Sequence, residues 1–164
     1  MSKQEIVETS SFEGKYLTFN LMEEYYGIDV NWILQIIAIP DITQIPKTPP
    51  FVKGVINLRG KIVPVIDLRL RFKLPEQKYN DRTSIVILKF KSDKGEIYIG
   101  IIIDKVIEVL DIHTKEIEKT PTFGVELDTM FILAMAKVKN KVVTLLDVEK
   151  IFSETELTQI QNKY

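Results

Sequence analysis

The chain repeats itself, and this repeat most constrains what it can fold into. The segment from Tyr25 to Leu34 matches the segment from Tyr98 to Ile107 at a shift of 73 residues, with tyrosine, glycine and isoleucine in common. Segment 61–72 matches segment 141–152 at a shift of 80, where lysine, valine, aspartate and phenylalanine coincide. The two matches come in the same order, and the seven additional residues of the second copy fall between 111 and 130. The sequence therefore predicts two similar supersecondary units.

Residue composition indicates that these units are built from strands. The 164 residues include 24 isoleucines and 14 valines, and β-branched side chains favour pleated, half-buried surfaces over helices. Apolar or alternating runs of strand length, separated by turn signals, predict ten strands and a mainly β fold. The expected strands are 16–21, 26–30, 33–39, 52–58, 62–66, 84–90, 96–103, 106–110, 131–138 and 142–146.

Ten strands in two copies give five strands per lobe, a number that closes most easily as a small barrel. The expected lobes are 13–80 and 81–152, with strand exchange between them allowed. A lobe of this size buries only about 60% of its unfolded surface, so the two barrels should pack on a shared hydrophobic core. Residues 1–12 are expected to be disordered. A short C-terminal helix is predicted over 153–164, because Ser153 and Glu156 form a capping-box pattern and Leu157 and Ile160 follow at helical spacing.

Several function classes are disfavoured by composition. There is no cysteine and one histidine, His113, so most thiol, zinc and general-base chemistry is excluded. Asp67 and Asp147 end matched strands and are expected to cap the backbone that follows. No apolar run approaches the roughly 20 residues of a membrane span. We expect a cytoplasmic protein that is not an enzyme, with no catalytic residues, no metal site and no cofactor.

A nucleic-acid-binding alternative comes from a basic stretch in which Asp67 is the only acid. A small β-barrel can bind single strands through a basic groove with stacked aromatic rings, but here only Phe51 and Phe72 are available. The net charge of −1 gives no general attraction for nucleic acid. For Arg69, Arg71 and Lys73 a solvated surface is the simpler interpretation. The basic residues are Lys53, Arg59, Lys61, Arg69, Arg71 and Lys73.

The segment 46–68 is predicted to be a proline-stiffened hairpin. Gly60 provides the turn conformation, Asn57 can cap the local backbone, and Arg59 stands on the turn. Pro64 has no N–H to donate to a ladder, so its strand is expected at a sheet edge or at a bulge.

This hairpin closely resembles the CheW family of bacterial chemotaxis coupling proteins. The matching residues are the run Gly-Val-Ile-Asn-Leu-Arg-Gly at 54–60 and Val-Pro-Val-Ile-Asp-Leu at 63–68, and the resemblance extends from Tyr16 to about Gln161. It implies a CheW-like domain over 13–152 made of two five-stranded SH3-like barrels. It also implies a cytoplasmic adaptor that couples chemoreceptor tips to the regulatory domain of the histidine kinase CheA. Such an adaptor is recruited to membrane-associated receptor arrays without inserting into the membrane, and it binds no nucleic acid.

The resemblance also implies site residues. The family usually has a glutamate where this chain has Gln35, and that acid looks like a partner for the turn arginine. The ion pair cannot form here, so Arg59 is expected to be freer to bind a partner. Receptor-binding positions would be Ile33, Gln35, Gly54, Arg59, Gly60 and Ser84, and kinase-binding positions would be Ile36 and Ile45.

Overall fold

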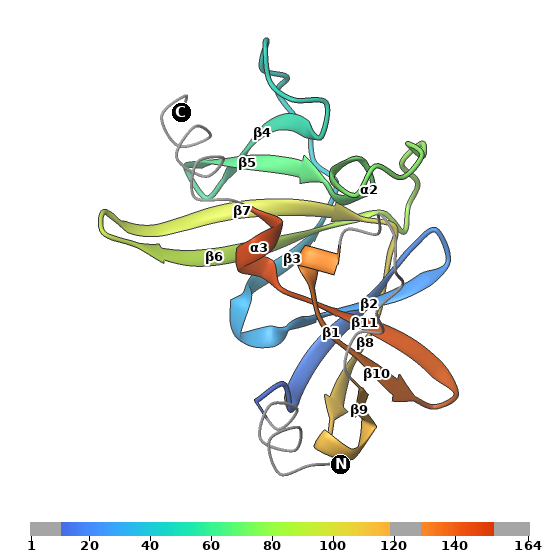
Figure 1. Ribbon diagram of the computed structural model, residues 1–164. Helices are drawn as coiled ribbons and strands as arrows, with labels where there is room; N and C mark the ends of the chain where they lie inside the picture. The colour runs from blue at the N-terminus through green and yellow to red at the C-terminus, as the bar shows by residue number, and fades with distance from the viewer. Residues whose placement is uncertain (1–10, 119–128, 153–164) are drawn as a thin grey trace.

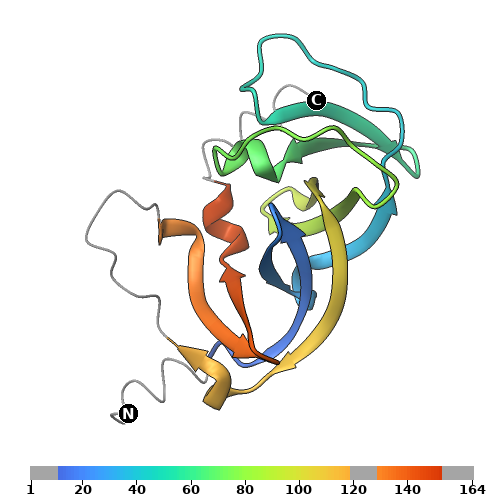
Figure 2. The same ribbon diagram turned by 90° about the vertical axis from the view of Figure 1, so that its right-hand side faces the viewer.

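Two β-sheets make up the fold in the computed structural model, which describes residues 11–118 and 129–152 (Figures 1 and 2). The six-stranded sheet has the order β8 (Lys105–Ile112), β1 (Gly14–Leu21), β2 (Glu24–Asp29), β11 (Lys141–Leu146), β10 (Ile132–Val138), β9 (Ile117–Glu118). The five-stranded sheet has the order β3 (Ile33–Ala38), β6 (Ser84–Ser92), β7 (Gly95–Ile103), β5 (Lys61–Asp67), β4 (Val52–Leu58). Short helices α2 (Leu68–Arg71) and α3 (Val148–Ile151) follow β5 and β11, and single 3-10 turns occupy Val30–Trp32, Thr114–Glu116 and Thr129–Phe131.

The predicted mainly β class is confirmed, and each of the ten expected strands is found within one or two residues of its predicted ends or is slightly longer. The strand that sequence patterning missed is β9. It has two residues, too few to show any alternation of apolar and polar side chains.

The internal repeat is confirmed in the strand pairing. Val65 of β5 pairs with Gly100 of β7, and the equivalent residues Leu145 and Gly27 pair in the same parallel arrangement between β11 and β2. Even the register irregularities recur, since the bulges at Lys53 and Leu133 lie 80 residues apart. The two copies therefore share one backbone plan, including local departures from regular pairing.

The two copies are intertwined. Each copy places its first hairpin, β1–β2 or β6–β7, in one sheet and its remaining strands in the other. The five-stranded sheet is consequently formed by the continuous segment 33–103, whereas the six-stranded sheet combines 14–29 with 105–146. The sheets thus do not divide at residue 80, where the lobes 13–80 and 81–152 were expected to meet. Strand exchange between the copies accounts for the difference.

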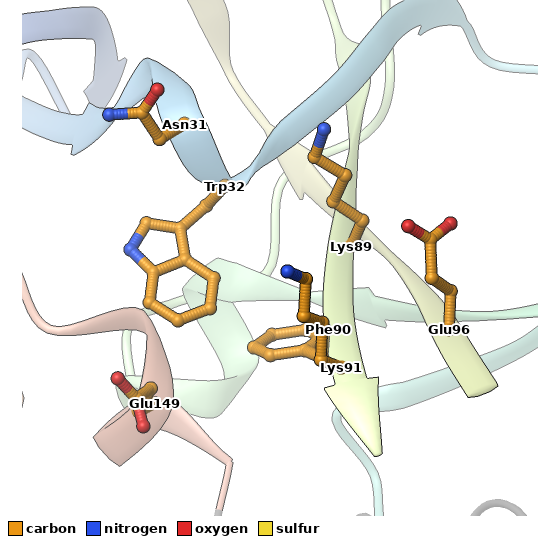
Figure 3. Close-up of a pocket in the computed structure, with 7 residues that line it drawn as sticks. All are labelled: Asn31, Trp32, Lys89, Phe90, Lys91, Glu96 and Glu149. Atoms are coloured by element: carbon orange, nitrogen blue, oxygen red, sulfur yellow. The ribbon is translucent and has the colours of Figure 1, made fainter. Parts of the chain in front are cut away.

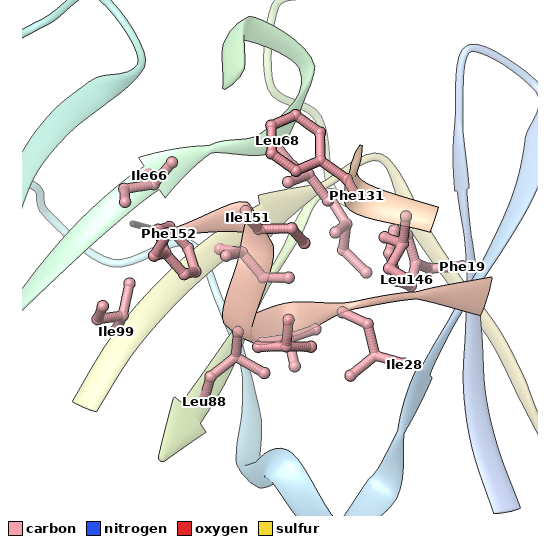
Figure 4. Close-up of a cluster of buried hydrophobic side chains, with 14 of the residues drawn as sticks. Phe19, Ile28, Ile66, Leu68, Leu88, Ile99, Phe131, Leu146, Ile151 and Phe152 are labelled. Carbon is pink, nitrogen blue, oxygen red and sulfur yellow. The ribbon is translucent and has the colours of Figure 1, made fainter. Parts of the chain in front are cut away.

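Three clusters of buried side chains lie in and between the sheets. One cluster, which includes Tyr16, Ala136 and Leu145, belongs to the six-stranded sheet, and another, which includes Ile56, Val65 and Ile85, belongs to the five-stranded sheet. The largest cluster combines residues of both sheets with α2 and α3 (Figure 4). This is the shared hydrophobic core predicted from the size of the lobes. Its members include Phe19, Ile28, Ile66, Leu88, Ile99, Phe131, Leu146, Ile151 and Phe152.

Strand β6 shows why the central strands are almost continuously apolar. Ile85 and Ile87 face the core of their own sheet, while Val86, Leu88 and Phe90 face the shared core. Successive side chains of a strand point to opposite faces, so a strand covered on both faces loses the alternation of apolar and polar residues.

The expectation that Pro64 marks an edge strand is wrong. Strand β5 is internal, between β4 and β7. Its pairing with β7 involves only Val65, Ile66 and Asp67, so the missing N–H of Pro64 falls just outside that ladder. The irregularity lies in the neighbouring strand β4, which has the register shift between Val52 and Gly54.

Two other expectations concern the ends of the chain. The predicted disorder of 1–12 falls on residues that, except for Ser11 and Phe12, lie outside the described part, and the predicted helix over 153–164 lies wholly outside it. In the ranges that are described, no helix is long and apolar enough to cross a membrane.

We expect the two sheets to unfold in one cooperative transition, because the hairpins are exchanged and the largest core is shared. Differential scanning calorimetry should give a single peak whose calorimetric and van't Hoff enthalpies agree. A fragment covering residues 1–80 should remain unfolded, since it lacks β8, β6 and β7, which pair with β1, β3 and β5 respectively. Two well-separated peaks, or a stably folded 1–80 fragment, would contradict this prediction.

Candidate functional site

The hairpin between β4 and β5 carries the residues that the sequence analysis singled out. Arg59 and Gly60 form its turn with φ values of 51° and 84°, both in the left-handed region. Asn57 Oδ1 accepts a hydrogen bond from the Gly60 N–H at 2.9 Å. The predicted roles of Gly60 and Asn57 in the turn are confirmed, and the turn leaves Arg59 exposed at its tip.

Arg59 has an internal hydrogen-bond partner although the ion pair with a glutamate is missing. Arg59 Nη2 donates a hydrogen bond to Gln35 Oε1 at 2.7 Å. Strands β3 and β4 are the two edges of the five-stranded sheet, so this contact joins opposite edges of a curled sheet. An amide oxygen accepts a hydrogen bond as a carboxylate does, although without the charge. The pair therefore differs in charge from an arginine–glutamate pair, while the hydrogen bond is kept.

The second copy contains the charged form of the same pair. Lys139 and Glu108 lie 80 and 73 residues after Arg59 and Gln35, and Lys139 Nζ lies 3.3 Å from Glu108 Oε1. Lys139 also stands on a hairpin turn with positive φ, at 52°. A turn cation that reaches the outer strand of its own sheet is thus a feature of both copies.

A tyrosine and two further charged residues lie beside Arg59. Lys61 Nζ lies 4.6 Å from the centre of the Tyr98 ring, a cation–π geometry, and Tyr98 donates a hydrogen bond to Glu96 Oε2 at 2.9 Å. That hydrogen bond is the main reason why the pKa of Tyr98 is raised, while the nearby Arg59 guanidinium acts in the opposite direction. The surface around the turn therefore combines an aromatic ring with charges of both signs.

The remaining expected positions are spread over the five-stranded sheet. Ile33 is half-buried at the start of β3, where it packs against the shared core, and Ile36 is exposed on the same strand. Gly54 is buried beside the backbone of the preceding loop, and Ser84 begins β6 opposite Ala38. Only Gln35 and Arg59, with Gly60 adjacent in the turn, are joined by a contact.

Ile45, the second expected kinase-binding position, lies in the connection between β3 and β4. Its side chain is half-buried, and its carbonyl oxygen accepts a hydrogen bond from Thr48 Oγ1 at 3.1 Å. Ile36, by contrast, is 42% exposed on β3. The two positions therefore offer different amounts of apolar surface to a partner.

Most cations of the basic stretch already contact internal partners. Lys53 pairs with Glu76, Arg69 pairs with Asp104, and Arg71 lies 5.2 Å and 4.8 Å from the ring centres of Phe51 and Phe131. The solvated surface expected for Arg69 and Arg71 is therefore wrong, since the Arg69 side chain is only 13% exposed and Arg71 is half-buried. Of the remaining cations, Arg59 and Lys61 contact Gln35 and Tyr98, and Lys73 is exposed, as expected.

The two aspartates at equivalent positions of the repeat cap the backbone that follows them, as expected. Asp67 and Asp147 are the N-caps of α2 and α3, where their Oδ1 atoms accept from the Leu70 and Lys150 N–H groups. Asp67 also accepts a 2.7 Å hydrogen bond from Tyr79, whose pKa is raised by burial and by that hydrogen bond. Within residues 11–118 and 129–152, no group of three histidine, cysteine or acidic side chains could hold a metal ion.

Comparison with known proteins identifies the family to which this fold belongs. A family model described as a CheW-like domain matches residues 15–156. The chain belongs to the CheW-like domain family. A chemotaxis protein CheW of Klebsiella aerogenes is 36% identical over 148 residues, covering 90% of this chain and 87% of the relative. A chemotaxis protein CheW of Bacillus subtilis is 34% identical over 141 residues, covering 85% of this chain and 87% of the relative.

Among solved structures, the CheW-like fold is matched by the crystal structure of the scaffolding protein TtCheW from Thermoanaerobacter tengcongensis. The TM-score is 0.76 at 34% sequence identity, over 88% of this chain and 90% of that chain. The family resemblance noted on the hairpin residues is therefore confirmed over most of the chain, in sequence and in fold.

Sequence reasoning missed Lys61 and Tyr98 as neighbours of Arg59. The repeat contained the signal: Lys141 and Tyr25 are their equivalents, and Lys141 Nζ also lies 4.6 Å from the Tyr25 ring centre. Two lysine–tyrosine pairs at equivalent positions are a pattern that the strand alignment could have shown.

Two glycines of the expected CheW site should respond differently to alanine. At Gly54, with φ +142°, a Cβ atom would lie 2.0 Å from the Thr43 carbonyl oxygen, whereas at Gly60, with φ +84°, nothing lies within 4 Å. Gly54→Ala should lower the free energy of unfolding by about 3 kcal/mol or more. Gly60→Ala, the matched control, should cost about 1 kcal/mol through backbone strain alone. Urea denaturation measures both, and equal losses would contradict the crowding at Gly54.

The pair of Gln35 and Arg59 should show a small, measurable coupling. Gln35→Glu should stabilise the protein by about 0 to 1 kcal/mol, because it converts a neutral acceptor into an exposed ion pair. The gain should vanish in the background of Arg59→Ala, and the double-mutant cycle in urea measures the difference. Strict additivity would show that the two side chains do not interact in solution. Raising the salt concentration should reduce the gain, which a packing effect would not explain.

Proposed function

We propose that this chain is a chemotaxis adaptor that couples chemoreceptor cytoplasmic tips to the regulatory domain of the histidine kinase CheA. The family match over residues 15–156, with relatives called chemotaxis protein CheW, carries this proposal. The protein would act in the cytoplasm, recruited to membrane-associated receptor arrays. The relationship to a protein described as scaffolding is consistent with a role in assembly rather than catalysis.

The receptor-binding surface would surround the turn of the β4–β5 hairpin and strand β3. Support comes from the exposed guanidinium of Arg59, which uses one donor on Gln35 and has four more N–H groups for a receptor carboxylate or carbonyl. The proposed receptor-binding residues are Ile33, Gln35, Gly54, Arg59, Gly60 and Ser84. The proposed kinase-binding residues are Ile36 and Ile45, of which Ile36 offers exposed apolar surface.

The position of the two proposed surfaces suggests how such an adaptor transmits a signal. Both proposed sets of binding residues lie on or beside the five-stranded sheet, which packs on the shared core, so this rigid sheet would hold the two partners in a defined relative orientation. A movement of the receptor then biases the kinase between two states, provided that the contacts differ in those states.

The decisive experiment combines the purified chain with a receptor signalling fragment and the kinase regulatory domain. Size-exclusion chromatography should recover one peak that contains all three proteins. Without the chain, the receptor fragment and the kinase regulatory domain should elute separately. Arg59→Ala should weaken receptor binding by about 1 to 3 kcal/mol if the contact excludes water, and less if it stays exposed.

Lys139→Ala is the matched control, because it removes the equivalent turn cation of the other sheet. It should leave receptor affinity unchanged, and the melting temperature of both variants should stay close to that of the parent. Absence of binding to both partners would overturn the proposal. Binding to single-stranded oligonucleotides that weakens steeply with salt would favour the nucleic-acid alternative instead.

A further inference from the structure

A pocket of about 480 Å³ opens where η1 (Val30–Trp32), the β6–β7 hairpin and α3 come together. Trp32 and Phe90 form its apolar part, with ring centres 5.6 Å apart and planes tilted by 43°. Figure 3 shows the Trp32 ring beside Phe90, with Glu149 projecting from α3. Lys89 and Lys91 on β6, Glu96 on β7 and Glu149 on α3 are exposed, so the lining carries two charges of each sign. Trp32 is the only tryptophan of the chain.

The internal repeat relates this pocket to a junction that is closed. Asn31 and Glu149 line the pocket, and their equivalents 73 and 80 residues away are Asp104 and Arg69. Arg69 and Asp104 form an ion pair whose side chains are 13% and 19% exposed, and Asp104 Oδ2 also accepts from the Met22 N–H at 2.9 Å. Because Asn31 and Glu149 cannot form an equivalent ion pair, one junction between the sheets is clamped and the other is open.

The closed junction is covered by the chain segment that follows α2. Arg69 Nη1 donates to the Pro75 carbonyl at 3.2 Å, and the Leu74 N–H donates to the Arg69 carbonyl at 2.8 Å. Leu74 packs against the shared core, and Gln77, Lys78 and Tyr79 line the small remaining space. Residues 73–83 therefore act as the cover of this junction.

The equivalent segment after α3 is residues 153–163, at the C-terminal end of the chain. Its starting point is fixed at the pocket, because Phe152 is buried and its ring lies edge-on to Phe90 at 6.0 Å. Ser153 and Glu156 form a capping-box pattern, and Leu157 and Ile160 fall on one side of the helix that this pattern predicts. Glu154 and Glu156 are opposite in charge to Lys89 and Lys91, which share the lining with Glu96 and Glu149.

We propose that the C-terminal segment 153–164 is the occupant of this pocket, with Leu157 and Ile160 against Trp32 and Phe90. The segment covers the open junction as residues 73–83 cover the closed one, and the acidic first turn faces Lys89 and Lys91. This assignment is independent of the chemotaxis function. It makes the pocket an intramolecular docking site, so an external ligand reaches Trp32 only by displacing the C-terminal segment.

Fluorescence of Trp32 tests the assignment in the full chain. Leu157→Ala combined with Ile160→Ala should shift the emission of Trp32 to longer wavelength and increase its quenching by acrylamide. Thr155→Ala combined with Gln159→Ala, on the opposite side of the same predicted helix, is the matched control and should change neither. A chain ending at Phe152 should show the same changes as the first variant, and a synthetic peptide of residues 153–164 at about 1 mM should reverse them, since that is the effective concentration of a short tether.

Far-UV circular dichroism and the melting temperature establish that each variant is folded. Unchanged emission and quenching in both the double-alanine variant and the shortened chain would overturn the proposal. Protection of Trp32 that depends on protein concentration would assign the pocket to a second copy and overturn the intramolecular contact. Protection that appears only when a receptor signalling fragment is added would assign it to that partner, with the same consequence.

Discussion

The exchange of hairpins between the two copies is the constraint on which the rest of the structure depends. Because β1–β2 pairs with β8 and β11, and β6–β7 pairs with β3 and β5, neither copy can complete a sheet from its own strands. The faces left between the two sheets are apolar and bury each other in the largest cluster of the molecule. Burial of this shared surface supplies the stabilisation that a lobe of this size lacks by itself.

Much of this fold could be predicted from local sequence signals. Isoleucine and valine density, turn residues and the two offsets of the repeat are all properties of short segments, and they correctly indicated ten of the eleven strands in the described part of the chain. The caps at Asp67 and Asp147 were predictable for the same reason, since each bonds to a residue three positions further on. Exchange of the hairpins could not be predicted. It pairs β1 with a strand about ninety residues away, and the residues of neither strand indicate which partner it has.

The errors at the candidate site have a common physical origin. Charge alone predicts that Arg59 lacks its ion pair, yet the amide oxygen of Gln35 accepts the same hydrogen bond. The solvated surface predicted for Arg69 and Arg71 is wrong because a guanidinium can be buried where a carboxylate or aromatic rings receive it. In each case the partner is distant in the sequence, so composition and spacing could not identify it. The family motif, in contrast, located the hairpin itself from contiguous residues.

The continuity of segment 33–103 has a consequence for how the protein is made. A ribosome delivers the N-terminal hairpin first, but the strands that flank it, β8 and β11, are synthesised only at residues 105–112 and 141–146. The five-stranded sheet can assemble as soon as β7 has emerged, because all of its strands precede residue 104. After that point Phe19, Leu21 and Ile28 still lack the cluster members Leu146, Ile151 and Phe152. The element made first is therefore the one that must wait longest for its partners, and its apolar side chains are the ones most exposed to unwanted association during synthesis.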